Sequence, residues 1–229
     1  MIFPPISQAK NSGESYARRP PIKQPRNFTK ADIVIENRNG DRVVLKDYRK
    51  KNFLIRNSYG RFTLKNEARA YSRLSGVEGI PRCFGLEKNL VLILEYINGK
   101  TLSSFKHGKV PESVFFKLEK ILFAMHSRGV VNSDLHRSNV ILTPDWDVYL
   151  IDFASALFTD KADSPGFFFR GIKDLDLHAF ERMRCKYLCL DDPVPKGFFG
   201  VCYNVLSKLK RRVKKIKRRV KKVKGFNFN

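Results

Sequence analysis

Three polar residues at fixed spacing carry the side chains of this chain that are best suited to chemistry. Asp134 is followed by Asn139 five positions later and by Asp152 eighteen positions later. A carboxylate in a loop can accept the proton of an attacking hydroxyl group, and carboxylate and amide oxygens are ligands that Mg²⁺ prefers. Each residue alone is a common turn residue. Together, beside the apolar runs 140–142 and 148–151, they predict phosphoryl transfer by one base and two metal ligands.

A second set of residues could bind the nucleotide itself. Lys46 lies in a strand-like run with apolar neighbours, and Glu67 follows twenty-one residues later in a helix-like run. A lysine on a strand can contact the α- and β-phosphates while a glutamate on a helix holds its ammonium group. The main chain around Glu95 and Ile97 would form a hinge that contacts the adenine. An exposed strand lysine and structural hinge side chains are the alternative interpretation.

The pattern along the chain predicts elements that could position these residues. The Asn-Gly pair at 39–40 lies between the strand-like runs 33–36 and 42–46, which is a strong signal for a hairpin. The apolar spacing predicts further strands at 90–96, 140–142 and 148–151, and helices at 64–74, 113–127 and 174–190. A strand-rich first part therefore precedes a helix-rich second part.

From about residue 28 to residue 190 the chain resembles the protein-kinase-like superfamily. The resemblance implies an α+β, two-lobed fold with a small strand-rich N-lobe and a helical C-lobe, followed by a basic C-terminal helix. It also implies ATP and Mg²⁺ as cofactors. The expected division is a flexible N-terminal arm at 1–26, an N-lobe at 27–96, a C-lobe at 97–200 and a basic amphipathic helix at 201–229. The roles that the resemblance implies are phosphate lysine for Lys46, its glutamate partner for Glu67, hinge for Glu95 and Ile97, catalytic base for Asp134, metal ligands for Asn139 and Asp152, and support of the catalytic loop for His136 and Asp174.

Departures from the protein-kinase pattern point to a branch of the superfamily. His136 stands two positions after the base, as in the D-x-H-x-x-N motif of aminoglycoside, choline and lipopolysaccharide sugar kinases, and Ser133 stands where protein kinases carry arginine. Ala154 stands where the Asp-Phe-Gly motif of protein kinases has glycine, and no G-x-G-x-x-G run is found. Only twenty-two positions separate Asp152 from Asp174 in the sequence, which leaves little room to bind a peptide substrate. Within the superfamily the chain looks most like small bacterial lipopolysaccharide core kinases that act on heptose or Kdo. Asp174 would equally suit the N-cap of the 174–190 helix.

The end of the chain is strongly basic. Residues 208–224 hold twelve Lys and Arg and no acid, and subtracting them from the net charge of +23 leaves +11 for the rest. Apolar residues recur three or four apart in this segment, which predicts a helix with one apolar stripe. An anionic membrane surface would match both the stripe and the charge; nucleic acid is the second interpretation, and a coiled coil would repel itself. The cations assigned to the membrane or another anion are Lys208, Lys210, Arg211, Arg212, Lys214, Lys215, Arg218 and Arg219.

These observations lead to one main expectation and two alternatives. The main expectation is an ATP-dependent kinase that phosphorylates a sugar hydroxyl of a lipopolysaccharide core precursor, cytoplasmic and peripheral on the inner membrane. The alternatives are a RIO-like atypical serine/threonine protein kinase and a pseudokinase or membrane-associated scaffold.

The N-terminus lacks the apolar core of a signal peptide, and no run reaches the ~18 apolar residues of a membrane-spanning helix. None of the four cysteines forms a C-x-x-C pair, so two buried thiols at Cys185 and Cys189 are expected rather than a metal site.

Overall fold

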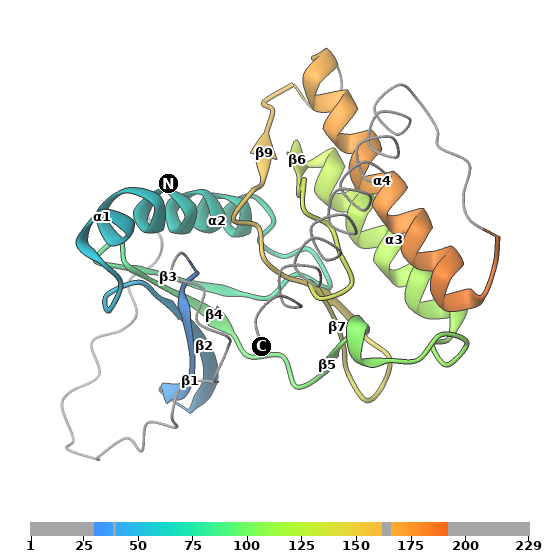
Figure 1. The fold of residues 1–229 in the computed structure, drawn as a ribbon, viewed down its shortest axis with the longest axis horizontal. Coiled ribbons are helices and arrows are strands. Elements are labelled where there is room, and N and C mark those ends of the chain that lie inside the picture. The colour runs from blue at the N-terminus through green and yellow to red at the C-terminus, as the bar shows by residue number, and fades with distance from the viewer. Residues whose placement is uncertain (1–29, 39, 162–165, 192–229) are drawn as a thin grey trace, which may run out of the picture.

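The computed structural model describes residues 30–38, 40–161 and 166–191. The predicted arm at 1–26 and the predicted basic helix at 201–229 lie outside the described residues, and so does the last part of the predicted C-lobe. The remaining segments form a sheet with one long helix on it, joined to a helical part (Figure 1).

The first part of the chain builds an antiparallel sheet in the order β1-β2-β4-β3. Arg38 pairs with Asp41, so only two residues connect the first two strands, and Gly40 has a φ of +86°. Glycine adopts this conformation without steric cost, and the hairpin predicted from the Asn-Gly pair is confirmed. The strands are β1 (Asp32–Arg38), β2 (Asp41–Asp47), β3 (Cys83–Glu87) and β4 (Val91–Glu95).

A continuous helical stretch crosses one face of this sheet (Figure 1). It begins with α1 (Phe53–Ile55), continues through one π-helical turn, η1 (Arg56–Gly60), and ends as α2 (Arg61–Arg73). Leu64 and Tyr71 of α2 are buried in the main core. Because Glu67 lies between them on the same face at helical spacing, it is drawn into the interior as well.

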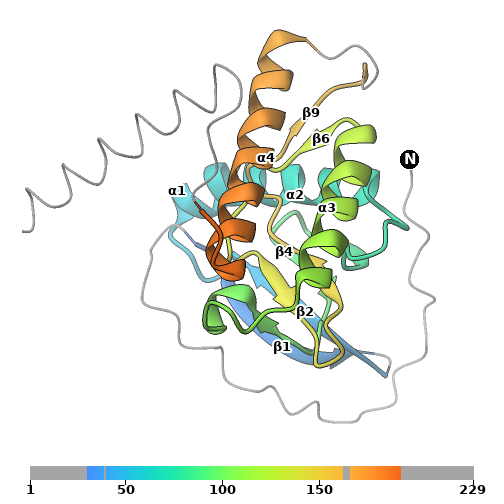
Figure 2. The same ribbon diagram turned by 90° about the vertical axis from the view of Figure 1, so that its right-hand side faces the viewer.

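Two antiparallel helices form the bulk of the second part and lie side by side in both views (Figures 1 and 2). They are α3 (Glu112–Ser127) and α4 (Phe167–Leu188), and a short 3₁₀ helix, η2 (Leu102–Ser104), precedes them. The Tyr187 hydroxyl of α4 donates a 2.8 Å hydrogen bond to the Leu102 carbonyl and ties α4 to η2. The predicted helix at 174–190 begins seven residues earlier, with Gly166 as its N-cap. The interpretation of Asp174 as an N-cap is therefore wrong.

Two small sheets support the loops of the site. One has the order β5-β7-β8 and the other pairs β6 with β9. The strands are β5 (Lys100–Thr101), β6 (Val130–Val131), β7 (Val140–Leu142), β8 (Val148–Leu150) and β9 (Leu157–Phe158). The loop from β6 to β7 carries Asp134 and Asn139, and Asp152 follows β8. Short strands fix both ends of these loops.

One apolar core runs from the α2 face of the first sheet to α3 and α4 and holds Leu92, Leu118 and Phe153, among others. The architecture is the expected α+β, two-lobed protein-kinase-like fold. None of the described helices is long and apolar enough to cross a bilayer.

Candidate active site

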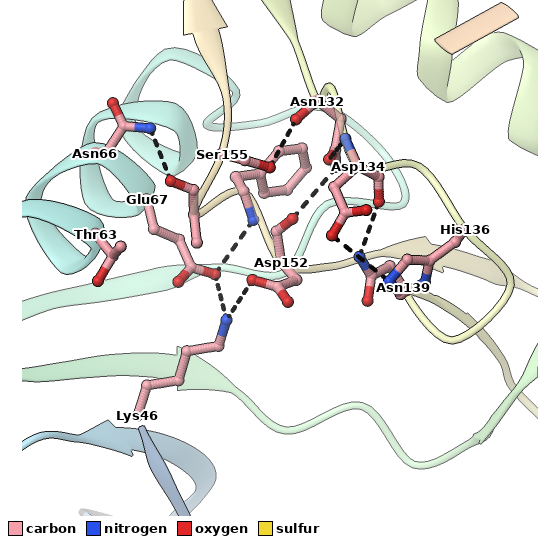
Figure 3. Close-up of polar contacts among 12 residues, drawn as sticks. Lys46, Thr63, Asn66, Glu67, Asn132, Asp134, His136, Asn139, Asp152 and Ser155 are labelled. Carbon is pink, nitrogen blue, oxygen red and sulfur yellow. Dashed lines mark hydrogen bonds and ion pairs between the residues drawn. The ribbon is translucent and has the colours of Figure 1, made fainter. Parts of the chain in front are cut away.

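Lys46 reaches the site from a central strand. In β2, alternate residues face opposite sides of the sheet, so Val43 and Leu45 join a small outer cluster while Lys46 points toward α2. Its Nζ donates to Glu67 Oε1 at 2.6 Å and to Asp152 Oδ1 at 3.0 Å (Figure 3). The ammonium group thus joins β2, α2 and the segment after β8.

Burial and charge act against each other in this cluster. Burial opposes the charged form of Lys46, but Glu67 and Asp152 outweigh it and raise the pKa of Lys46 above its ordinary value. Burial raises the pKa of Glu67, and Lys46 counteracts this only in part. Burial also opposes ionisation of Asp152, yet Lys46 overcomes it and the pKa of Asp152 is lowered. Lys46 is therefore a cation at neutral pH, and Asp152 is a carboxylate.

The Asp152 backbone is held in an uncommon conformation. Its φ is +68°, a left-handed value that few non-glycine residues adopt. The Asp152 carbonyl accepts a hydrogen bond from Asn132 Nδ2 at 3.3 Å, and the next N–H, of Phe153, donates to Glu67 Oε1 at 3.3 Å. The Phe153 ring is fully buried and meets Tyr71 edge to face with 5.1 Å between centroids. These contacts fix the direction in which the carboxylate leaves the main chain.

Asp134 and Asn139 share one loop and are joined to each other. Asn139 Nδ2 donates to the Asp134 carbonyl at 3.2 Å, and the Asn139 carbonyl accepts from Ile151 N at 2.9 Å. The first bond uses the amide nitrogen, so the amide oxygen is the atom left to meet a cation. Asn139 is buried, whereas the Asp134 side chain is exposed. Figure 3 shows Asp134, Asn139 and Asp152 grouped on one side of Lys46.

A buried aspartate braces this loop, and it is Asp176 rather than the predicted Asp174. The Asp176 carboxylate accepts from the backbone N–H groups of Asn132 at 2.8 Å and Ser133 at 3.0 Å, and it lies 3.3 Å from His126 Nε2. Residues two apart on a helix point about 200° apart, so only one of the two aspartates can face the loop. Asp176 is 1% exposed.

His136 does not brace the loop from within. Its side chain is about half exposed and its Nε2 lies 3.6 Å from Asp134 Oδ2. Its carbonyl, however, accepts the Asn139 N–H at 2.8 Å and so closes the turn that carries Asn139. The contribution of His136 to the loop is therefore made by its main chain.

Asn132 was not singled out from the sequence, although it connects both halves of the site. It is fully buried. Its Oδ1 accepts from Asp134 N at 3.2 Å, while its Nδ2 donates to the Asp152 carbonyl. Its position two residues before Asp134 is the only signal that the sequence offers.

The hinge follows β4. The Glu95 N–H donates to the Arg82 carbonyl at 2.8 Å, and the Glu95 carboxylate accepts from Arg82 N at 2.9 Å. The Tyr96 N–H donates to the Arg42 carbonyl at 3.1 Å. These bonds hold the end of β4 in the sheet and give the Glu95 side chain a structural role. The contact between the main chain at Ile97 and an adenine stays a prediction.

The oxygen donors of the site suit Mg²⁺. This ion is usually held by one or two carboxylates together with substrate phosphates, rather than by a cage of protein ligands. Asp152 and Asn139 supply one carboxylate and one amide oxygen on the same side of Lys46. No group of three or more His, Cys, Asp and Glu that could enclose a metal occurs among the described residues, so phosphate oxygens would complete the shell.

Known proteins resemble this chain in sequence and in fold. A family model described as the RIO domain matches residues 33–191. A probable SapB synthase of Streptomyces coelicolor is 31% identical over 59% of this chain, and KEOPS complex subunit Bud32 of Pyrococcus abyssi is 32% identical over 45% of it. The chain spans 17% and 44% of the lengths of these two relatives. The crystal structure of the Rio2 kinase from Chaetomium thermophilum superposes with a TM-score of 0.59 and 15% identity, covering 81% of this chain and 61% of that one.

The RIO-domain match contains every site residue described above, from Lys46 to Asp176, and extends over more than half of the chain. The chain belongs to the RIO-domain family.

Proposed function

We propose that this protein is an ATP- and Mg²⁺-dependent kinase of the RIO type that phosphorylates a serine or threonine hydroxyl of a protein. The observation that carries the proposal is the pair of bonds from Lys46 to Glu67 and Asp152, set beside the braced loop of Asp134 and Asn139. The family match supports the protein-kinase alternative better than the sugar-kinase expectation. A solved Rio2 kinase in complex with ADP and Mg²⁺ supports the choice of cofactors.

The roles follow from geometry and charge. Lys46 holds the α- and β-phosphates, and Glu67 keeps its ammonium group in place. Asp152 and Asn139 provide oxygens for Mg²⁺, which neutralises charge that develops on the phosphates. Asp134, exposed at the loop, orients the acceptor hydroxyl and accepts its proton. The braced loop lowers the entropic cost of bringing the two reactants together.

A sugar hydroxyl stays a second candidate acceptor. The connection from Asp152 to α4, which begins at Phe167, is short and leaves little chain to bind an extended peptide. His136 next to Asp134 also fits the D-x-H-x-x-N pattern of sugar kinases. A lipopolysaccharide core precursor is one such acceptor, but nothing in the family match favours it.

Phosphate transfer from labelled ATP tests the acceptor. Purified protein is incubated with Mg²⁺ and ATP, once with serine- and threonine-containing proteins and once with core-containing lipid A, and Asp134→Asn serves as control. Label on protein serine or threonine supports the proposal. Label on the sugar alone would show that the protein is a sugar kinase instead. Equal labelling by Asp134→Asn would contradict the role of Asp134 as catalytic base. No labelling by the wild type, together with a biological activity kept by Asp134→Ala, would support the pseudokinase interpretation instead.

The basic segment 208–224, which lies outside the described residues, suggests where the enzyme works. Its twelve cations and apolar stripe support attachment to an anionic membrane surface. We propose that the enzyme lies in the cytoplasm, attached peripherally to the inner membrane. Nucleic acid is the alternative partner of the basic segment.

A further inference from the structure

Two consecutive residues of α2 bind the segment that follows Asp152. Glu67 accepts the Phe153 N–H at 3.3 Å. Its neighbour Asn66 donates from Nδ2 to the Ala154 carbonyl at 3.0 Å and to the Ala156 carbonyl at 2.9 Å. Three main-chain groups within four residues are therefore held by adjacent side chains of one helix. Figure 3 shows Asn66 and Glu67 on the side of α2 that faces Asp152 and Ser155.

The geometry at Asn66 is specific to a primary amide. The two carbonyls belong to a turn that the Ala156 N–H closes by donating to the Phe153 carbonyl at 3.0 Å. A side-chain amide nitrogen carries two hydrogens and can satisfy two acceptors at once. A carboxylate of the same shape would replace this nitrogen with a negatively charged oxygen that faces both carbonyls.

The held segment starts at the strained residue of the site. Asp152 has a left-handed φ of +68°, and such a conformation persists only where its surroundings impose it. Asn132 fixes the Asp152 carbonyl from the loop side, and the Asn66 and Glu67 contacts fix the next residues from the α2 side. The Asp152 carboxylate is thus set between two supports.

A third contact belongs to the same arrangement. Ser133 Oγ donates to the Ser155 carbonyl at 2.7 Å, and Ser155 Oγ donates to the Asn132 carbonyl at 3.2 Å. This reciprocal pair ties the segment to the loop of Asp134. Asn66 ties the same segment to the helix that holds the partner of Lys46. A shift of α2 would therefore move the Lys46 partner and the metal ligand together.

We propose that Asn66 is a positioning residue for the metal ligand Asp152. It touches neither metal nor nucleotide, and it sets the direction of the Asp152 carboxylate through the turn Phe153–Ala156. The inference rests on the proposed function, because it assigns Asp152 to Mg²⁺. It goes further because it assigns the orientation of the Asp152 carboxylate to Asn66 of α2, the residue next to Glu67.

The test compares Asn66→Ala, Asn66→Asp and the neighbouring exposed control Lys65→Ala with the wild type. Calorimetry measures ADP affinity with and without Mg²⁺, and hydrogen exchange follows the amides of residues 153–156. We expect the tightening of ADP binding by Mg²⁺ to fall about tenfold in Asn66→Ala, in the range for residues that support metal ligands. The fall should be larger in the isosteric Asn66→Asp, with metal-free ADP affinity unchanged and faster exchange confined to 153–156. Lys65→Ala should match the wild type.

The outcomes separate this inference from the proposed function. If the wild type shows Mg²⁺-dependent ADP binding and both Asn66 variants keep it in full, the positioning role is refuted while the proposed function stands. If the variants lose metal-free ADP binding to the same degree, Asn66 supports the fold in general and the inference also fails. If the wild type binds ADP without any effect of Mg²⁺, the metal role of Asp152 falls, and the inference falls with it.

Discussion

At the scale of single residues, the site depends on one ammonium group between two carboxylates. The Glu67 side chain is 2% exposed and that of Lys46 is 16% exposed. A buried charge is stable only with its partner, so the two are coupled in folding as well as in function. The sequence predicted this pair from a strand lysine and a helix glutamate twenty-one residues apart, considered together with the Asp134, Asn139 and Asp152 pattern of kinases, and the structure brings the two side chains together.

Replacement of Lys46 by methionine leaves Glu67 buried without a counter-charge. We expect Lys46→Met to lower the free energy of unfolding by about 3–5 kcal/mol and to abolish Mg²⁺-ADP binding. The double variant Lys46→Met/Glu67→Gln should regain most of the stability but not the binding. Urea unfolding and calorimetry measure the two effects. Lys117→Met, which breaks the exposed pair with Asp147, is the control and should cost at most about 1 kcal/mol.

The lowered pKa of Asp152 gives a pH dependence of definite sign. A carboxyl whose folded-state pKa is depressed stabilises the fold above its unfolded pKa, roughly 3.9, and loses that contribution as the pH falls through the lower folded value. We expect the melting temperature of the wild type to drop more steeply than that of Asp152→Asn between about pH 5 and pH 3. Parallel melting curves of the two proteins over that range would contradict the shift.

At the scale of elements, the ends of helices decide where the loops of the site begin. Gly129 terminates α3 with a φ of +68°, and a Cβ there would lie 2.2 Å from the Thr159 carbonyl oxygen next to β9. That oxygen belongs to the main chain and cannot rotate away. The end of α3 and Thr159, which follows β9, therefore lie too close together to leave room for a side chain at position 129.

Gly129→Ala should add both backbone strain and overlap. We expect a loss of about 3 kcal/mol in unfolding free energy, which corresponds to a melting temperature lower by roughly 6–12 °C. Gly76 has a φ of +77° with nothing within 4 Å of its added Cβ, so Gly76→Ala carries the strain alone and should cost about 1 kcal/mol. Thermal unfolding of the two variants separates overlap from strain, and equal losses would refute the packing argument.

The elements also show where sequence patterns stop being informative. The predicted helix at 113–127 matches α3, because its apolar residues repeat at helical spacing and Gly129 follows it. Strand β3 was not predicted, since its sequence Cys83–Glu87 contains Gly85 and has no continuous apolar run, and its pairing with β4 shifts register between Cys83 and Gly85. Which aspartate of α4 braces the loop depends on how α4 is rotated about its own axis. Packing of α4 against the loop fixes this rotation, and the spacing of residues in the sequence does not indicate it.

At the scale of the whole molecule, the sequence predicted the two-lobed architecture because strand-like patterns are concentrated in the first part of the chain and helix-like patterns in the second. The acceptor could not be predicted in this way, because specificity depends on loops and surfaces rather than on the core. The contact of Asn66 with residues 154 and 156 could not be predicted from the sequence either. It joins positions 88 and 90 residues apart, and no local pattern indicates such a pair.

The distribution of charge leads to a prediction for the complete chain. Removing residues 206–229 deletes the basic segment, in which each cation near an anionic bilayer contributes on the order of 1 kcal/mol. We expect the truncated protein to be released from vesicles that contain anionic lipid while Mg²⁺-ADP binding is kept. Co-sedimentation at low and high salt measures the release, with neutral vesicles as control. Unchanged sedimentation of the truncated protein would refute the membrane proposal.

The fully buried Phe153 has a consequence for inhibitor design. Its ring packs edge-on against Tyr71, its N–H is bound by Glu67 and the following carbonyls are bound by Asn66. A compound that needs the space of this ring must first break all of these contacts, so its affinity is reduced by the cost of opening the site. Compounds that only replace the nucleotide meet no such barrier, and screening directed at the adenine and phosphate positions is the more productive route.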